Sequence, residues 1–445
     1  MDFASFKQAV IARCQELGIE EYELYYTQSE STSVEVFQHE IKEFTASTEG
    51  GVCFRAIVNG KMGYASTQAL NEQEAKAVVD KAVDNAAFLE SEEQVFLAEG
   101  GQEYRSTTTE PLPIPATDHL IARALEVQNE IYASNEAVVD GCMTNAVVEK
   151  SSTAIYNSKG LDLRSDNTLT AWVMASVVSD GKEMADEYTI KLGDLDKIDT
   201  KAAIAKATAS ALEKLGGDVA PTGQYPVVFH PEAMSSLLGV FSFIFSSENA
   251  QKGLSKLQGK EGTLIASELV TIVDDPFYPG SLMQHSFDAE GSPTYTKNLV
   301  EKGEFKTLLY NLKTAAVAGV QTTGNASKGG YNAPVAVQPF TMYLVPGEQS
   351  EEALLAPIEK GVYITDLGGL HAGANPISGD FSLQSSGYMI ENGKKTNFVK
   401  SFTVAGNFYD LLQNIRALAS NLETPGMGRF GSPSVLVDGL SIAGK

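Results

Sequence analysis

The segment that most constrains the fold of this chain is an apolar stretch that follows a short strand pattern. Residues 225–249 read YPVVFHPEAMSSLLGVFSFIFSSEN. Tyr225–Phe229 predicts a strand, and Pro231 suits the first position of the helix that follows it. Because this helix is apolar on every side from residue 237 to 245, we expect it to be buried in a core. One turn into such a helix is a common place for metal ligands, but none of these apolar side chains binds a metal or moves a proton.

The size and charge of the chain exclude several classes of protein. Its 445 residues suffice for two or three domains, and an apolar content of 43% with 20% charged residues indicates a folded protein. The formal net charge of −24 argues against a nucleic-acid surface and against binding to an anionic membrane, since both need clustered Lys and Arg. The acidic balance favours solubility, with attraction of basic or unfolded peptides as a second interpretation.

The cysteines and the N-terminal residues indicate the cellular compartment in which we expect the protein. Cys14, Cys53 and Cys142 are far apart and form no CxxC pair, which is not a disulfide framework. Cys14 and Cys53 lie in apolar patterns and are interpreted as buried packing residues. The first 18 residues lack the apolar region of a signal peptide, and no apolar stretch is long enough to span a bilayer. We therefore expect a cytoplasmic protein.

The first part of the chain is typical of a helix followed by an antiparallel meander and a second helix. An amphipathic helix over residues 2–17 is expected to end at Gly18. Asn59-Gly60 is a two-residue hairpin turn, and Asn71 caps the second helix with Glu74 three residues later. Short strands are expected over residues 22–27, 33–38, 41–47, 52–58 and 62–67.

The rest of the chain divides at a proline-rich linker and at a glycine-rich boundary. The linker over residues 90–116 is extended because PLPIP disfavours helix, and residues 216–224 separate a middle part from a sheet-rich part with long glycine-containing loops. We predict an α+β protein with parts over residues 1–110, 115–218 and 223–445. Further helices are expected over residues 117–133, 199–215, 351–359 and 407–418, and further strands over 137–148, 152–157, 168–179 and 434–437.

Few side chains form a recognisable catalytic pattern. The five histidines form no HExxH pair, so His230 is interpreted as a strand end or helix cap, and His371 in GGLHAGANP as a flexible-loop residue. Ser385-Ser386-Gly387 lacks the strand–turn–helix context of a nucleophile and is interpreted as a polar strand edge. Asp274-Asp275-Pro276 is interpreted as a turn, and the glycine loops match no nucleotide-binding pattern.

Three segments resemble those of the TldD/TldE (PmbA) family, whose members were once called modulators of DNA gyrase and are regarded as peptide-maturation metalloproteases. The segments are FSSENAQKGLSKLQGKEG at 245–262, GANPISGDFSLQSSGYMIENGKK at 373–395 and GSPSVLVDGLSIAG at 431–444. The resemblance covers nearly the whole chain. It implies that an active, TldD-type subunit carries His-Glu-x-x-x-His on a helix after a strand and a cysteine ligand in a glycine-rich loop near the C-terminus.

This chain departs from that metal-binding pattern at every ligand. The positions of the family motif fall at Gly239, Val240 and Ile244, and the C-terminal loop LETPGMGRFGSPS contains no cysteine. The resemblance therefore implies a TldE/PmbA-type subunit with no metal and no catalytic residue of its own. Zinc is expected in a TldD-type partner subunit.

We expect this chain to be the non-metal subunit of a cytosolic two-component metallopeptidase that degrades or matures unfolded or leader peptides. The candidate substrate-binding residues lie in the glycine-rich segment: Asn375, Ser378, Gly379, Asp380 and His371. Two alternatives remain open. One is a non-enzymatic, homodimeric binding or regulatory protein of the gyrase-modulator type, and the other is an independent hydrolase that uses His371 or the serines.

Overall fold

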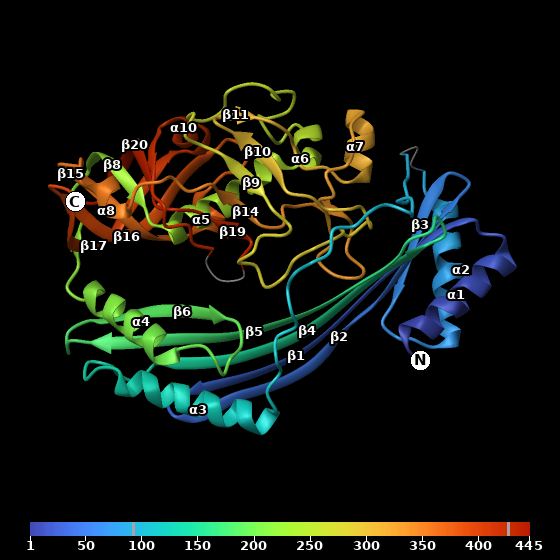
Figure 1. Cartoon of the computed structure of the whole chain (residues 1–445), viewed down its shortest axis with the longest axis horizontal. Helices are drawn as coiled ribbons and strands as arrows, with labels where there is room; N and C mark the ends of the chain where they lie inside the picture. The colour runs from blue at the N-terminus through green and yellow to red at the C-terminus, as the bar shows by residue number, and fades with distance from the viewer. Residues whose placement is uncertain (91–93, 425–427) are drawn as a thin grey trace.

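The computed structural model describes residues 1–90, 94–424 and 428–445. The first half of the chain forms a long curved sheet with helices at both ends, and the second half forms a sheet-rich body above it (Figure 1). The predicted α+β class is confirmed. No helix within the described residues is long and apolar enough to cross a membrane.

One antiparallel sheet of six strands runs through the first half, in the order β3-β2-β1-β4-β5-β6. Several predicted short strands are halves of long ones, because β1 pairs with β2 and β4 without interruption through its polar middle at Ser29. The predicted breaks between these short strands are wrong, because the polar residues between them also pair in the sheet. The strands are β1 Glu21–Phe37, β2 Glu40–Val58, β3 Lys61–Thr67, β4 Met143–Asn157, β5 Asp162–Ser179 and β6 Met184–Leu192.

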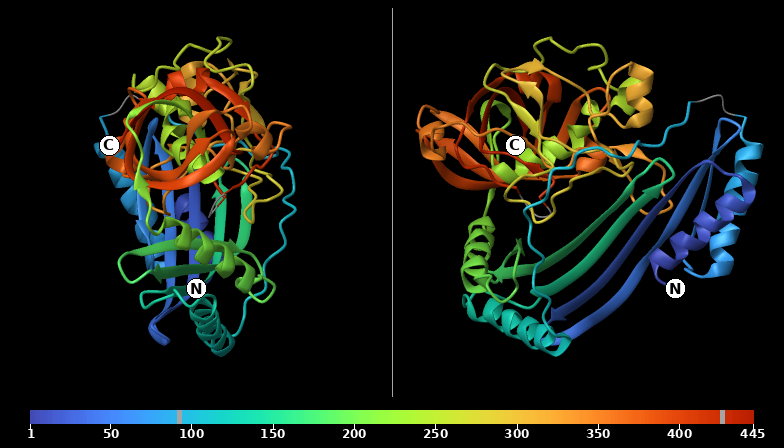
Figure 2. Two further views of the ribbon diagram at one scale, coloured as in Figure 1. Left: turned by 90° about the vertical axis from the view of Figure 1, so that its left-hand side faces the viewer. Right: turned by 45° about the vertical axis from the view of Figure 1, so that its right-hand side comes forward.

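Two pairs of helices cover opposite ends of this sheet, each over its own core (Figure 2). The helices are α1 Phe3–Leu17, α2 Glu72–Phe88, α3 Thr117–Ala133 and α4 Thr200–Lys214.

The local signals predicted for the first part are confirmed. Gly18 ends α1 at φ +67°, Asn71 Oδ1 accepts from the N–H of Glu74 at 2.9 Å, and Asn59-Gly60 turns at φ +52° and +75°. Each signal needs only the residues next to it.

The sheet joins the first two predicted parts of the chain. β1 and β2 belong to the first part and β4 to the second, yet β1 pairs with β4 along its whole length, and residues 94–116 connect α2 to α3 without helix or strand. The predicted division at residues 110–115 therefore does not separate two sheets, because strands from both sides of it belong to one sheet.

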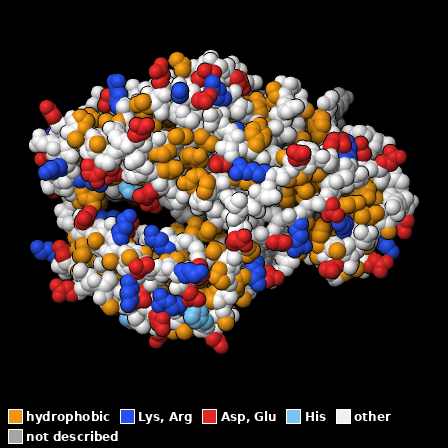
Figure 3. Space-filling model, in the orientation of Figure 1, with side chains coloured by type: hydrophobic (Ala, Val, Ile, Leu, Met, Phe, Trp, Pro, Cys, Tyr) orange, Lys and Arg blue, Asp and Glu red, His pale blue; other side chains and the backbone are white. Residues whose placement is uncertain are grey.

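The curved sheet and the C-terminal body meet at a buried cluster of side chains. Tyr25, Cys53 and Ile155 on the sheet pack with Phe287 of the C-terminal body. Arg55 Nε contacts Glu23 at 2.8 Å beside them. Away from this junction, Figure 3 shows an open hollow between the body and the end of the sheet that carries α4 and β6.

The C-terminal body contains a closed ring of strands, visible end-on in the left view of Figure 2. The ring closes because β20 pairs with both β8 and β17. A second sheet, in the order β11-β10-β9-β14-β19, packs into the same core. The ring strands are β8 Gly223–Phe229, β15 Lys360–Gly368, β16 Asp380–Glu391, β17 Lys394–Asn407 and β20 Val435–Ala443, with β18 Ile415–Leu418 and β7 Asp218–Val219 at its margins. The second sheet has β9 Ile272–Asp274, β10 Lys297–Glu301, β11 Glu304–Phe305, β14 Met342–Leu344 and β19 Phe430–Gly431.

Four predictions for this body need correction. The helix expected over 407–418 ends early, because α10 spans Phe408–Gln413 and β18 pairs with β20. Helix α8, Glu351–Leu355, is shorter than expected, and the final strand extends to Ala443. Ser385-Ser386-Gly387 is not at a sheet edge, since β16 lies between β15 and β17.

Candidate functional site

The apolar stretch after β8 is not one continuous helix. Helix α5, Pro231–Phe241, is followed by a 3₁₀ turn over Ser242–Phe245 and by a short helix, α6, Ser247–Gln251. Phe241 is buried and stacks on Phe408 with ring centroids 4.4 Å apart. The prediction of burial on every side is wrong for one face, where Gly239, Val240 and Phe243 remain partly exposed.

This face borders a hollow of about 450 Å³, which we call the α5 hollow. The opposite walls come from the segment 336–339 and from β19, which packs against α5 (Figure 1). The residues that line it are Gly239, Val240, Ser242, Phe243, Ser246, Glu248, Asn249, Leu309, Ala336, Val337, Gln338, Pro339, Arg429 and Phe430.

The structure brings two of the three altered motif positions to this hollow. Gly239 and Val240 line it, whereas Ile244 lies in the 3₁₀ turn and is fully buried in the core. Because the α-helix ends at Phe241, position 244 no longer follows the regular helical spacing from position 239.

The residues at the α5 hollow do not fit a zinc ion. Zinc needs three or four N, S or O ligands that converge on it. The described lining contains neither histidine nor cysteine, and its one carboxylate, Glu248, pairs with Lys252 at 2.6 Å. No cluster of three His, Cys, Asp or Glu side chains suited to a metal exists in the described ranges. Part of the loop compared with the cysteine-bearing loop, residues 425–427, lies outside the described residues.

His230 caps α5, as the sequence predicted. Its Nδ1 accepts from the main-chain N–H of Glu232 at 3.3 Å, and the main-chain N–H of His230 donates to the carbonyl oxygen of Ile364 at 2.8 Å. Burial lowers the pKa of His230, so the neutral imidazole that accepts this hydrogen bond is favoured. His230 is therefore part of the frame that holds α5.

The glycine-rich segment forms a tight turn before β16. Asn375 Oδ1 accepts from the N–H groups of Ile377 and Ser378 at 3.0 and 3.2 Å. Asn407 Nδ2 donates to Asp380 Oδ1 at 2.8 Å, and this hydrogen bond lowers the pKa of Asp380. The short polar side chains of this turn thus bond mainly to the chain around them.

Neighbouring elements hold the same turn from outside. Lys256 Nζ donates to the carbonyl oxygen of Ser378 at 2.7 Å. Gly379 has φ +88°, and a Cβ there would lie 2.6 Å from the ring of Tyr409. None of the described lining of the α5 hollow comes from this turn. A substrate-binding role for Asn375, Ser378, Gly379 and Asp380 therefore stays a prediction.

His371 and the serines lie on different elements. His371 is exposed on a short helix, α9, Leu370–Gly373, and not in an irregular loop. Ser385 Oγ donates to the carbonyl oxygen of Leu383 at 3.0 Å. No hydrogen bond joins His371 to Ser385 or Ser386, all three of which the structure describes.

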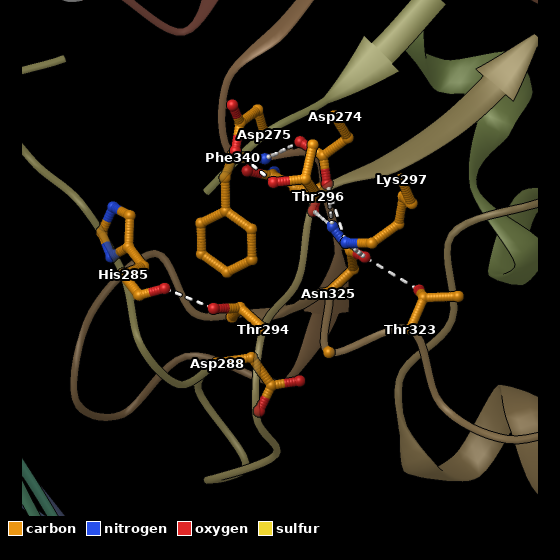
Figure 4. Close-up of polar contacts among 12 residues, drawn as sticks. Asp274, Asp275, His285, Asp288, Thr294, Thr296, Lys297, Thr323, Asn325 and Phe340 are labelled. Atoms are coloured by element: carbon orange, nitrogen blue, oxygen red, sulfur yellow. Dashed lines mark hydrogen bonds and ion pairs between the residues drawn. The ribbon is translucent and has the colours of Figure 1, made fainter. Parts of the chain in front are cut away.

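Figure 4 shows a buried polar cluster that no pattern in the sequence predicts. One of its members, Asn325, bonds to Gln338, which lines the α5 hollow. Asp274 Oδ1 accepts from the N–H of Phe340 at 2.7 Å. Its Oδ2 accepts from Asn325 Nδ2 at 2.8 Å and from Lys297 Nζ at 3.3 Å. Asp275 initiates the predicted turn, since its Oδ1 accepts from the N–H of Phe277 at 3.0 Å. Asp274 instead belongs to the buried cluster.

The buried cluster also fixes the main chain of Gln338, which lines the hollow. Asn325 Nδ2 donates to the carbonyl oxygen of Gln338 at 3.0 Å, and the N–H of Gln338 donates back to the carbonyl oxygen of Asn325 at 3.1 Å. The side chain of Asp274 is fully buried and that of Lys297 is 5% exposed, so water competes little for these bonds. No local pattern links Asp274, Lys297 and Asn325, which come from separate segments.

The fold and this site define a class of protein. Models of three successive PmbA/TldA metallopeptidase domains match the chain: domain 1 over residues 22–86, the central domain over 110–215 and the C-terminal domain over 222–444. The chain belongs to this PmbA/TldD family of metallopeptidases, and the resemblance of the three segments is confirmed.

Individual relatives are similar over almost the whole chain. A solved structure from Thermotoga maritima, described as a candidate modulator of a DNA gyrase, is 30% identical with a TM-score of 0.90, and the match covers 99% of this chain and 100% of that one. TldE from Thermococcus kodakarensis is 23% identical with a TM-score of 0.87 and coverages of 98% and 99%. A metalloprotease PmbA homolog of Haemophilus influenzae is 25% identical over 95% of this chain and 92% of its own.

Proposed function

We propose that this chain is the non-metal, TldE/PmbA-like subunit of a cytosolic two-component metallopeptidase, and that it holds unfolded or leader peptides for a TldD-type partner. The observation that carries the proposal is the α5 hollow. In a chain of a metallopeptidase family, Gly239 and Val240 line a hollow whose residues do not fit zinc. In this proposal zinc and the cleavage step belong to the partner, and this chain contributes peptide binding.

Strand addition is the mode of binding that suits this wall. β13, Ala336–Val337, pairs with β12, Ala326–Ser327, on one side, and both of its residues line the hollow. Main-chain groups bind an extended peptide with little regard to its side chains, as capture of unfolded peptides requires. The two hydrogen bonds between Asn325 and Gln338 support this wall against movement when a peptide binds.

Reconstitution tests the proposal. Purified chain, a TldD-type partner and their mixture are each given a labelled unfolded peptide. We expect cleavage only by the mixture, and a chelator is expected to stop it. The variant Val240→Lys places a charged side chain in the α5 hollow and is expected to lower peptide binding and cleavage by the mixture. Val317→Lys, at a side chain that is 68% exposed on helix α7, Leu312–Ala318, is the matched control.

Two results contradict the proposal. Cleavage by the partner alone at the rate of the mixture removes any need for this chain. A stable homodimer that binds no peptide and does not change cleavage by the partner favours the non-enzymatic, gyrase-modulator alternative. The observation that favours this alternative is the description of the Thermotoga maritima relative as a candidate modulator of a DNA gyrase.

A further inference from the structure

We propose that Arg429 at the rim of the α5 hollow recognises a carboxylate of the bound peptide, so that the preferred ligand is an extended segment with an acidic group beside apolar side chains. This inference rests on the proposed peptide binding and adds a preference to it. Arg429 is the one Lys or Arg in the described lining of the hollow. A guanidinium group is well suited to carboxylates because its donors lie in a planar fork.

The charge balance around Arg429 favours an anion at this place. The chain as a whole has a formal net charge of −24, so a carboxylate is repelled from most of its surface. Glu248, the one carboxylate in the described lining, is neutralised by Lys252 at 2.6 Å. A peptide carboxylate near Arg429 is therefore attracted by the guanidinium group. The repulsion from Glu248 is offset by Lys252.

The position of the Arg429 side chain is set from the opposite wall. Arg429 Nη1 donates to Gln338 Oε1 at 2.7 Å, which leaves other donors of the guanidinium for a ligand. Asn325 in turn holds the main chain of Gln338. Asp274 accepts a hydrogen bond from Asn325 and so holds its side chain (Figure 4). A side chain that is held before the ligand arrives loses less conformational entropy on binding.

Apolar contacts lie next to this charge. Phe430 follows Arg429 in the chain and packs against Gly239, and Val240 and Phe243 extend the apolar surface. A peptide strand whose carboxylate contacts Arg429 therefore brings neighbouring side chains to apolar partners. A general anion-binding patch has a positive charge but no apolar surface beside it, so the apolar side chains next to Arg429 favour a peptide over a simple anion.

Binding of labelled heptapeptides tests the inference. The parent peptide alternates Ser and Val, and each position in turn carries Glu or Gln. Each peptide is made with a free C-terminal carboxylate and with a C-terminal amide, which distinguishes a side-chain carboxylate from a chain end. Fluorescence anisotropy gives the affinity for the full chain at low and high salt.

We expect at least one Glu peptide, or one free-acid peptide, to bind roughly 1.5- to fivefold more tightly than its Gln or amide counterpart, the range for an exposed ion pair. The preference should shrink between about 0.05 and 0.5 M salt because the pair is exposed. Arg429→Met should bring each Glu or free-acid peptide to the affinity of its Gln or amide counterpart, and Arg429→Lys should retain part of the preference.

The control removes the same charge elsewhere. Arg416 is 65% exposed and pairs with Asp438 at 2.8 Å, so Arg416→Met changes the net charge equally and should keep the preference. Equal binding of acidic and neutral peptides by the unaltered chain overturns the inference and leaves the proposed peptide binding intact. Failure of every peptide to bind overturns both. A preference that survives Arg429→Met also overturns the inference.

Discussion

The ring of Phe430 lies against Gly239, so closely that a Cβ at Gly239 would be 3.2 Å from Cδ2 of the ring. By resemblance to the family, the first histidine of the metal-binding motif corresponds to position 239. A larger side chain at this position meets the ring, and Ile244, the place of the second histidine, is buried away from the hollow. Besides lacking zinc ligands, the site therefore has little room for a larger side chain at position 239, and position 244 does not line it.

Restoring the motif is therefore expected to be insufficient for zinc binding. We predict that the combined variant Gly239→His, Val240→Glu and Ile244→His binds no stoichiometric zinc, since position 244 does not face the hollow. Elemental analysis after dialysis against zinc measures this, with circular dichroism to check that the variant is folded. One zinc per folded chain would show that the two positions do converge.

The turn at Gly379 is predicted to tolerate no side chain. Gly379→Ala adds a Cβ at φ +88° and 2.6 Å from the ring of Tyr409. We expect a loss of about 3 kcal/mol of stability, from left-handed backbone strain and from the clash. The matched control is Gly181→Ala, at φ +83° with nothing within 4 Å, which should cost about 1 kcal/mol from the backbone alone. Equal urea midpoints for the two variants would contradict the role of the clash.

The buried pair of Asp274 and Lys297 should show strong coupling. Asp274→Ala leaves Lys297 buried without its carboxylate and should cost about 3 to 5 kcal/mol. Adding Lys297→Met removes the unpaired charge and should recover part of that loss. Urea unfolding of both single variants and the double variant gives the coupling energy. Additive losses would show that the two side chains act independently.

Glu351 is predicted to make stability depend on pH in the acidic range. Burial would raise the pKa of Glu351, but hydrogen bonds from Ser434, Tyr363 and Lys395 outweigh burial and lower the pKa to about 2. A carboxylate with a lowered pKa stabilises the fold above its unfolded pKa, and this stability is lost as the pH falls from there through the folded pKa. At pH about 3.5, one pH unit below the unfolded pKa of 4.5, the loss is about 1.4 kcal/mol.

Comparison with Glu351→Gln isolates this contribution. The difference in unfolding free energy between the unaltered chain and the variant should shrink by about that amount between pH 7 and pH 3.5. A difference that stays constant with pH would contradict the lowered pKa of Glu351.

The parts of the fold that could be predicted from the sequence are those set by neighbouring residues. The stop at Gly18, the hairpin at Asn59-Gly60 and the cap at Asn71 follow from local backbone chemistry. The strand β18 was missed because its pairing with β20 involves residues distant in the chain, and local propensity favoured helix there.

The candidate site was predictable only in part. Gly239 and Val240 were singled out because the resemblance places the family motif on them, and both line the hollow. The bond between Asp274 and Asn325 joins residues 51 positions apart, and no spacing rule connects them. Arg429 was missed for the same reason, since its partner Gln338 comes from a different segment.

In the proposed function this chain binds peptide but depends on a partner for the metal and for the cleavage step. The most direct measurement is the zinc content of the purified chain together with its cleavage of an unfolded peptide, with and without a chelator. We predict no stoichiometric zinc and no cleavage by the chain alone. One tightly bound zinc per chain, with cleavage that the chelator abolishes, would show that this chain is itself the metallopeptidase.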